Sequence, residues 1–122
     1  MPTDIQVTVE PELIRVVYRG KVEIDATTEM LRKVARIASE SQRKLLLFDI
    51  READYRGYYV GTIKHAEDGP SLGIDRTFRV AFLGSGGEPM LRYIEDVTVN
   101  RGYESKAFTD ESEALAWLRR GL

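Results

Sequence analysis

Near its centre the chain reads Lys44-Leu45-Leu46-Leu47-Phe48-Asp49-Ile50-Arg51, its strongest local structural signal. Four apolar residues stand together from Leu45 to Phe48 without alternating with polar ones, and Asp49 ends the run. An uninterrupted apolar run of this length is typical of a central strand that is covered on both faces. Such strands belong to α/β proteins, in which helices pack against the sheet. We therefore predict a central strand at residues 45–48.

The segments around this strand alternate between strand and helix patterns. Before it, we predict strands at residues 5–9, 13–18 and 22–24 and a helix that begins near Asp25. After it, we predict helices that begin near Asp54, Glu88 and Asp110, the first running to about residue 67, and strands at residues 77–83 and 103–108. The order βββαβαβαβα indicates a single α/β domain over residues 1–122, with a mixed β-sheet of four to six strands and about four helices.

The composition excludes several classes of function. With 18 basic and 20 acidic residues in 122, the chain lacks the basic excess that nucleic-acid binding usually requires. Having no Cys and one His, it offers neither a thiolate nucleophile nor a multi-His metal site. No apolar run approaches the ~20 residues of a membrane span, and the N-terminus does not resemble a signal peptide. We expect a cytoplasmic protein with no metal or other cofactor, no membrane insertion and no nucleic-acid partner.

Two blocks, together with the element order, resemble the SpoIIAA-like branch of the STAS superfamily, the sulphate-transporter and anti-sigma-factor-antagonist domains. The first block is residues 44–51. The second is Asn100-Arg101-Gly102-Tyr103 followed at residues 107–118 by AFTDESEALAWL. The resemblance spans nearly the whole chain, and it implies a small open sheet with helices packed largely on one side.

The resemblance also shows where this sequence departs from the family. In anti-sigma-factor antagonists, the helix after the central strand begins with an Asp-Ser-Ser-Gly-like motif, and a partner kinase phosphorylates its Ser to switch binding off. Counted from Asp49, the matching stretch here is 57–60, Gly-Tyr-Tyr-Val, and no Ser lies between Ser41 and Ser71. The resemblance therefore implies a regulatory or protein-interaction module that lacks the phosphorylatable serine.

A tyrosine cluster occupies this same region of the sequence. Three of the six tyrosines, Tyr55, Tyr58 and Tyr59, fall within five positions and are interleaved with Gly57 and Gly61. On a helix, Tyr55 and Tyr59 would share one face. Two interpretations stay open: the rings pack on the sheet, or they form a contact surface, because Tyr buries area while keeping a polar tip.

Three further features carry chemistry of lower specificity. Asp49 and Arg51, with Glu52 and Asp54, follow the carboxyl end of the central strand, where ligands gather in open α/β sheets. The segment 84–87, Gly-Ser-Gly-Gly, precedes a predicted helix and suits a structural turn or an anion site that includes Ser85. His65 has no companion group in the sequence, and we expect it at the surface or at a helix end rather than as a general base.

No nucleophile elbow and no metal-ligand spacing appear, so we do not expect an enzyme. We expect a non-catalytic interaction module whose partner is a second copy of the chain or a regulatory protein. The alternative is a carrier or sensor of a small apolar, lipid-like molecule, held in a pocket beside the helix after the central strand and enclosed in several hundred Å³. In both cases we place the functional surface at residues 51–63 and 85–88. The candidate binding residues, with none catalytic, are Asp49, Arg51, Tyr55, Tyr58, Tyr59 and Ser85.

Overall fold

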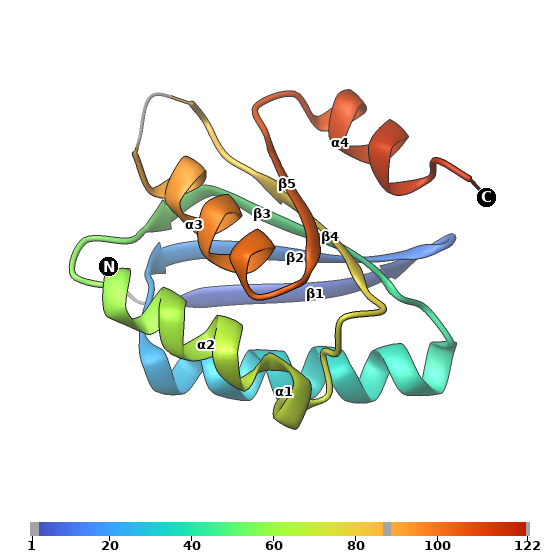
Figure 1. Cartoon of the computed structure of the whole chain (residues 1–122), viewed down its shortest axis with the longest axis horizontal. Coiled ribbons are helices and arrows are strands. Elements are labelled where there is room, and N and C mark those ends of the chain that lie inside the picture. Colours follow the sequence, from blue (N-terminus) through green and yellow to red (C-terminus); the bar gives the residue numbers. More distant parts are fainter. Residues whose placement is uncertain (1–2, 87–88, 122) are drawn as a thin grey trace.

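Five strands form one mixed sheet in the order β1-β2-β3-β4-β5 in the computed structural model, which describes residues 3–86 and 89–121 (Figure 1). Strand β1 runs antiparallel to β2, and the other neighbouring strands are parallel. The strands are β1 (Asp4–Glu10), β2 (Leu13–Lys21), β3 (Leu45–Asp54), β4 (Arg79–Leu83) and β5 (Glu104–Phe108). The helices are α1 (Ile24–Ser41), α2 (Tyr59–Leu72), α3 (Pro89–Asn100) and α4 (Glu111–Leu118).

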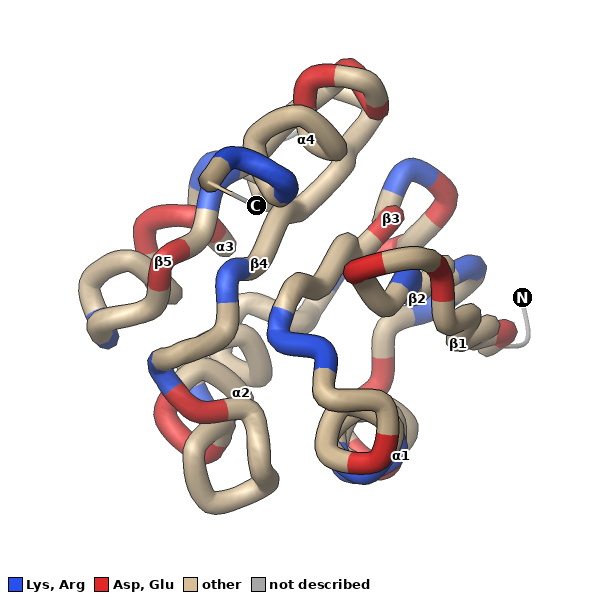
Figure 2. The backbone as a smooth tube through the Cα atoms, turned by 90° about the vertical axis from the view of Figure 1, so that its right-hand side faces the viewer, with Lys and Arg blue, Asp and Glu red and all other residues tan. Residues whose placement is uncertain are grey.

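Strand β3 lies at the centre of the sheet and is covered on both faces, as the apolar run predicts. Because side chains alternate along a strand, Leu46, Phe48 and Ile50 join the larger core cluster, which α1, α2 and α3 cover. Leu47 joins a smaller cluster on the opposite face, with Leu118 of α4. Figures 1 and 2 show α1 and α2 on one side of the sheet and α4 on the other. The predicted α/β class with four helices is confirmed.

The predicted third strand at residues 22–24 is wrong. Strand β2 continues through Gly20 to Lys21, which pairs with Asp54 of β3, and α1 begins at Ile24. A glycine at position 20 suits a turn, but Gly20 (φ 85°) stays in the strand because it pairs with Ala53 of β3. The ladder to β1 already ends at Arg19. Val22 instead packs into the larger core cluster. The observed order is therefore ββαβαβαβα.

The helix after the central strand begins later than predicted. Strand β3 continues to Asp54, which therefore pairs in the sheet and does not cap a helix. A turn closed by the Tyr58 N–H and the Tyr55 carbonyl follows, with Gly57 at φ 80°, and α2 begins at Tyr59. Tyr55 and Tyr59 consequently do not share a helix face. At the other end, α2 passes through residues 68–70 and stops at Leu72.

The last two helices begin close to their predicted positions. Helix α3 starts at Pro89, and the predicted start at Glu88 lies outside the described residues. Asp110 caps α4, since its carboxylate accepts from the N–H groups of Ser112 and Glu113. Within residues 3–86 and 89–121, no helix combines the length and apolar character that crossing a bilayer requires.

Candidate functional site

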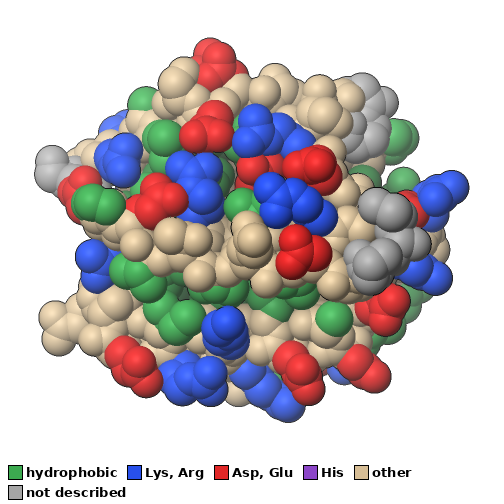
Figure 3. All heavy atoms as spheres, turned by 180° about the vertical axis from the view of Figure 1, so that it is seen from behind, with side chains coloured by type: hydrophobic (Ala, Val, Ile, Leu, Met, Phe, Trp, Pro, Cys, Tyr) green, Lys and Arg blue, Asp and Glu red, His purple; other side chains and the backbone are tan. Residues whose placement is uncertain are grey.

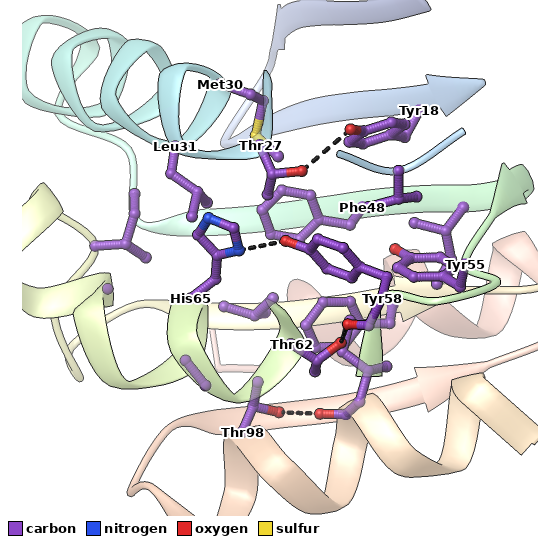
Figure 4. A pocket seen from close by; sticks show the side chains of 18 of the residues that line it. Tyr18, Thr27, Met30, Leu31, Phe48, Tyr55, Tyr58, Thr62, His65 and Thr98 are labelled. Atoms are coloured by element: carbon purple, nitrogen blue, oxygen red, sulfur yellow. Dashed lines mark hydrogen bonds between the residues drawn. The ribbon is translucent and has the colours of Figure 1, made fainter. Parts of the chain in front are cut away.

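A cavity of about 110 Å³ lies inside the larger core, between the sheet and helices α1, α2 and α3 (Figure 4). Its wall is mostly apolar. The main apolar lining residues are Val22, Met30, Leu31, Phe48, Ile50, Ala66, Ile74, Val80, Phe82 and Ile94. Polar side chains interrupt this wall, and they include Thr98 and Tyr103, from α3 and the turn that follows it. Those discussed below are Tyr18, Thr27, Tyr58, Thr62 and His65.

Tyr58 holds the N-cap position of α2 and turns its ring inward, so that it is 6% exposed. Its ring stacks on the His65 imidazole at a centroid distance of 5.8 Å. Gly61 makes room for this ring, because a Cβ at that position would lie 2.5 Å from Tyr58 Cε2. Burial raises the pKa of the Tyr58 hydroxyl to about 12, which keeps it protonated near neutral pH.

His65 is 8% exposed and has a hydrogen-bond partner on each ring nitrogen. Nδ1 bonds the hydroxyl of Tyr58, and Nε2 lies 2.8 Å from the Thr28 hydroxyl of α1. Burial lowers the pKa of the imidazole below its ordinary value, which favours the neutral ring. The expected surface or helix-end role is therefore wrong. His65 lies on the buried face of α2, together with Gly61, Thr62, Ala66 and Gly69.

A second pair of hydroxyls lies against the same cavity. Tyr18 of β2 and Thr27 of α1 are hydrogen-bonded at 3.1 Å, and the N–H of Glu23 donates to the Tyr18 oxygen. Thr27 also lies close enough to Tyr58 to lower the pKa of that tyrosine, in opposition to burial. Figure 4 shows the three side chains approaching one region from three segments of the chain. We call Tyr18, Thr27 and Tyr58 the hydroxyl cluster.

A cleft of about 350 Å³ opens on the surface between the end of β3 and the start of α3. Four of the six predicted site residues line it: Arg51, Tyr55, Tyr59 and Ser85. Tyr55 and Ile50 line both this cleft and the internal cavity, so they lie between the two spaces. Of the predicted loop 85–88, residues 87 and 88 lie outside the described part of the chain.

The exposed apolar side chains beside this cleft are Tyr59 and Val60, in the first turn of α2. Tyr59 is 43% exposed and meets the ring of Tyr93 edge-on at 5.0 Å, whereas Val60 is 78% exposed. Arg56, in the turn before α2, pairs with Asp54 at 2.7 Å. The exposed side chains of Tyr59 and Val60 thus form a small apolar surface beside the charged pair Asp54–Arg56.

Asp49 does not line the cleft and lies on the face of the sheet that α4 covers. Arg51 donates to it at 2.7 and 2.9 Å and also contacts Glu111 of α4, which in turn pairs with Arg15 of β2. Burial acts to raise the pKa of Asp49, but the hydrogen bonds from Arg51 outweigh it and hold that pKa below its usual range. The pair thus helps to hold α4 on the sheet.

The surface charges are intermixed. Figure 3, which views the molecule from behind, shows basic side chains interspersed with acidic ones rather than gathered in a patch. Strand β2 contributes to this pattern, because Arg19 pairs with both Asp4 and Glu52. In the part of the chain that the structure describes, no group of three or more acidic, His or Cys side chains is arranged to hold a metal ion.

Neither a protein-family model nor a curated protein matches the sequence, whereas solved structures match it over nearly its whole length. An anti-sigma factor antagonist from Mycobacterium paratuberculosis is similar at a TM-score of 0.65 and 14% identity, covering 97% of this chain and 95% of that one. An uncharacterized Shewanella loihica protein with a SpoIIAA-like fold matches at 0.60 and 20%, covering 95% and 93%. The chain has a SpoIIAA-like fold.

SpoIIAA itself, in its unphosphorylated form, is similar at a TM-score of 0.54 and 16% identity, over 96% of this chain and 99% of that chain. The resemblance drawn from the sequence is thus confirmed at the level of the fold. Within this SpoIIAA-like fold, the stretch 57–60 stands at the start of α2, where Tyr58 is the N-cap residue.

Proposed function

We propose that the chain is a non-catalytic regulatory module that acts by binding another protein through its contact surface. This contact surface comprises Tyr59 and Val60 with the adjoining cleft residues Arg51, Arg56 and Ser85. The observation that carries the proposal is the 78% exposure of Val60 next to the half-exposed Tyr59, which lines the cleft. An exposed apolar patch with a polar rim is typical of a protein–protein contact.

The similar structures support this role by analogy. Two of them are named as anti-sigma factor antagonists, a role that is directed at another protein. Their likeness establishes the fold, and the function is carried over as part of the proposal. The contact surface has no Ser at residues 57–60, so we propose that binding is not switched by serine phosphorylation there. The partner is a regulatory protein or a second copy of the chain.

Replacing Val60 with Ser tests the contact surface. We expect Val60→Ser to weaken binding by roughly tenfold, because a central apolar contact in an interface contributes about 1–2 kcal/mol. Self-association is measured by sedimentation velocity, and the dissociation constant of any protein partner by calorimetry. The matched control is Val99→Ser on α3, where the side chain is 48% exposed and lies outside the contact surface. Equal affinities for the wild type and Val60→Ser would contradict the proposal.

The internal cavity favours a second candidate function, a carrier or sensor of a small apolar molecule. A dry cavity of ~150 Å³ in another protein binds benzene, so a cavity of about 110 Å³ with an apolar wall limits the ligand to a single small ring. It is smaller than the several hundred Å³ expected for a lipid-like ligand. The second candidate is therefore restricted to small molecules.

A further inference from the structure

We propose that the internal cavity binds a small, neutral aromatic molecule that carries one hydrogen-bond donor, such as a phenol, and that the hydroxyl cluster accepts this hydrogen bond. The proposal rests on the second candidate function, the carrier or sensor, and names its class of ligand. It does not depend on the contact surface, whose residues lie outside the cavity wall.

The size and shape of the cavity suit a single ring. Its volume of about 110 Å³ is of the same order as the ~150 Å³ of a dry cavity that holds benzene in another protein. Two of its lining rings, Phe48 and Phe82, are stacked at 5.6 Å, and Tyr55 and Tyr58 are tilted against each other at 5.9 Å. Aromatic lining residues favour an aromatic ligand, because offset and edge-on ring contacts contribute binding energy beyond that of the buried apolar area.

The lining residues of the cavity exclude a charged ligand. None of them is Asp, Glu, Lys or Arg, and His65 is buried with both ring nitrogens already bonded. A carboxylate or an ammonium group would therefore lose its water without gaining a counter-ion, which costs several kcal/mol. Only a neutral molecule avoids this desolvation penalty.

The hydrogen-bond capacity of the hydroxyl cluster identifies the polar group. Its three hydroxyls bring three hydrogens and six lone pairs. The Glu23 N–H occupies one lone pair, the Tyr18–Thr27 bond uses one hydrogen and one lone pair, and the bond to His65 uses one hydrogen or one lone pair. A further hydrogen bond from Thr27 to Tyr58 would use one more hydrogen and one more lone pair. In either tautomer of His65, the cluster then still has more unused lone pairs than unused hydrogens. The cluster therefore keeps free acceptor capacity in either tautomer, which a ligand that donates a hydrogen bond can use.

Phenol and toluene form a matched pair of probes for this proposal, because they have nearly the same shape and only phenol has a donor. In an apolar cavity without an acceptor, phenol would bind more weakly than toluene, because its hydroxyl would lose its hydrogen bonds to water. We expect the wild-type protein to bind phenol at least as tightly as toluene and not to bind benzoate. Affinities are measured by following the methyl resonances of Thr62 and Ala66 by NMR.

Two Tyr-to-Phe variants locate the acceptor. Tyr58→Phe keeps the ring and removes the hydroxyl, so phenol affinity should fall about tenfold, whereas toluene affinity should change little. Tyr18→Phe should act in the same direction and serves if Tyr58→Phe does not fold. The control is Tyr103→Phe, which removes a hydroxyl from the same wall, one that donates to the Ile74 carbonyl. Its ratio of phenol to toluene affinity should equal that of the wild type.

The possible results separate the inference from the function on which it rests. If neither phenol nor toluene binds, both the carrier or sensor function and the inference are wrong. If toluene binds and phenol binds at least tenfold more weakly, or if Tyr58→Phe and Tyr18→Phe leave the ratio unchanged, the acceptor role is wrong while the apolar carrier remains. Binding of benzoate with an affinity similar to that of phenol would overturn the neutral class.

Discussion

Tyr58 and Tyr59 are neighbours in sequence but point to different environments. Tyr58 is buried against His65 in the cavity wall, whereas Tyr59 is exposed at the cleft. The sequence pattern shows an unusual tyrosine cluster and predicts its place after the central strand. It does not predict that the Tyr58 ring points inward and the Tyr59 ring outward. These directions depend on the turn at 55–58, which delays the start of α2.

The buried role of His65 and its contacts with Thr28 and Tyr58 are the part of the candidate site that sequence reasoning missed, although Tyr58 itself was among the predicted residues. The buried face of α2 consists of small and polar residues rather than an apolar stripe, so hydrophobic periodicity does not reveal it. The partners Thr28 and Tyr58 come from residues 37 and 7 positions away. No local signal connects them, and only the packing of α1 against α2 brings them together.

A titration of His65 tests its burial. It is the single His in the chain, so its imidazole gives one resolved NMR signal. Because burial lowers the pKa of His65, we expect a midpoint below the ordinary 6.5. The unfolded chain then binds more protons just below pH 6.5, so the free energy of unfolding falls as the pH falls through this range. The stabilising effect of the neutral ring is complete above pH 6.5.

The control for this titration is His65→Gln, which has no imidazole to protonate. Its free energy of unfolding should therefore fall less than that of the wild type as the pH is lowered. Thermal unfolding at pH 7.5 and pH 5.5 measures that difference. A midpoint at or above 6.5, with equal pH dependence in both proteins, would show that the imidazole is solvated.

At the scale of elements, long-range pairing overrides local turn signals. Gly20 predicts a turn and Asp54 predicts a helix cap, but the two residues belong to the paired ends of β2 and β3. Each added ladder pair satisfies backbone groups that would otherwise need water, so the strands extend past both signals. The apolar run of β3 and the cap of α4 are predicted well, because their signals are local and agree with the packing.

Helix α4 provides a comparison between two neighbouring apolar residues. Leu118 is fully buried in the smaller core cluster. Trp117, by contrast, is half-buried between Phe108 and the guanidinium of Arg79. We expect Leu118→Ala to lower the free energy of unfolding by ~2–5 kcal/mol, and Trp117→Ala by less than the ~3–5 kcal/mol typical of a buried Trp.

Urea denaturation of the two variants measures these values. Ala116→Gly, at an exposed position of the same helix, is the control and should cost only the ~1 kcal/mol of helix propensity. A larger loss for Trp117→Ala than for Leu118→Ala would show that the two side chains have been assigned to the wrong sides of the helix.

The whole molecule is divided by its sheet into two unequal cores. Helices α1, α2 and α3 cover the larger core and its cavity, whereas α4 alone, with eight residues, covers the smaller one. The resemblance implied this one-sided packing, because it concerns the order and direction of elements. The cavity was not predictable in the same way, since it depends on how side chains from distant elements fail to fill the space between them.

This asymmetry predicts that the fold opens in steps. Helix α4 is held by Ala114 and Leu118 and by Arg79 of β4, whose guanidinium donates to carbonyls at the end of the helix. The ion pairs of Glu111 with Arg15 and Arg51 contribute little, because the Glu111 side chain is 40% exposed. Strand β3 is covered on both faces and bonded on both edges. We expect the amide hydrogens of α4 to exchange through a partial opening of lower free energy than global unfolding, and those of β3 only through global unfolding. Native-state hydrogen exchange at increasing urea measures both, and identical free energies and urea slopes for α4 and β3 would instead identify one cooperative unit.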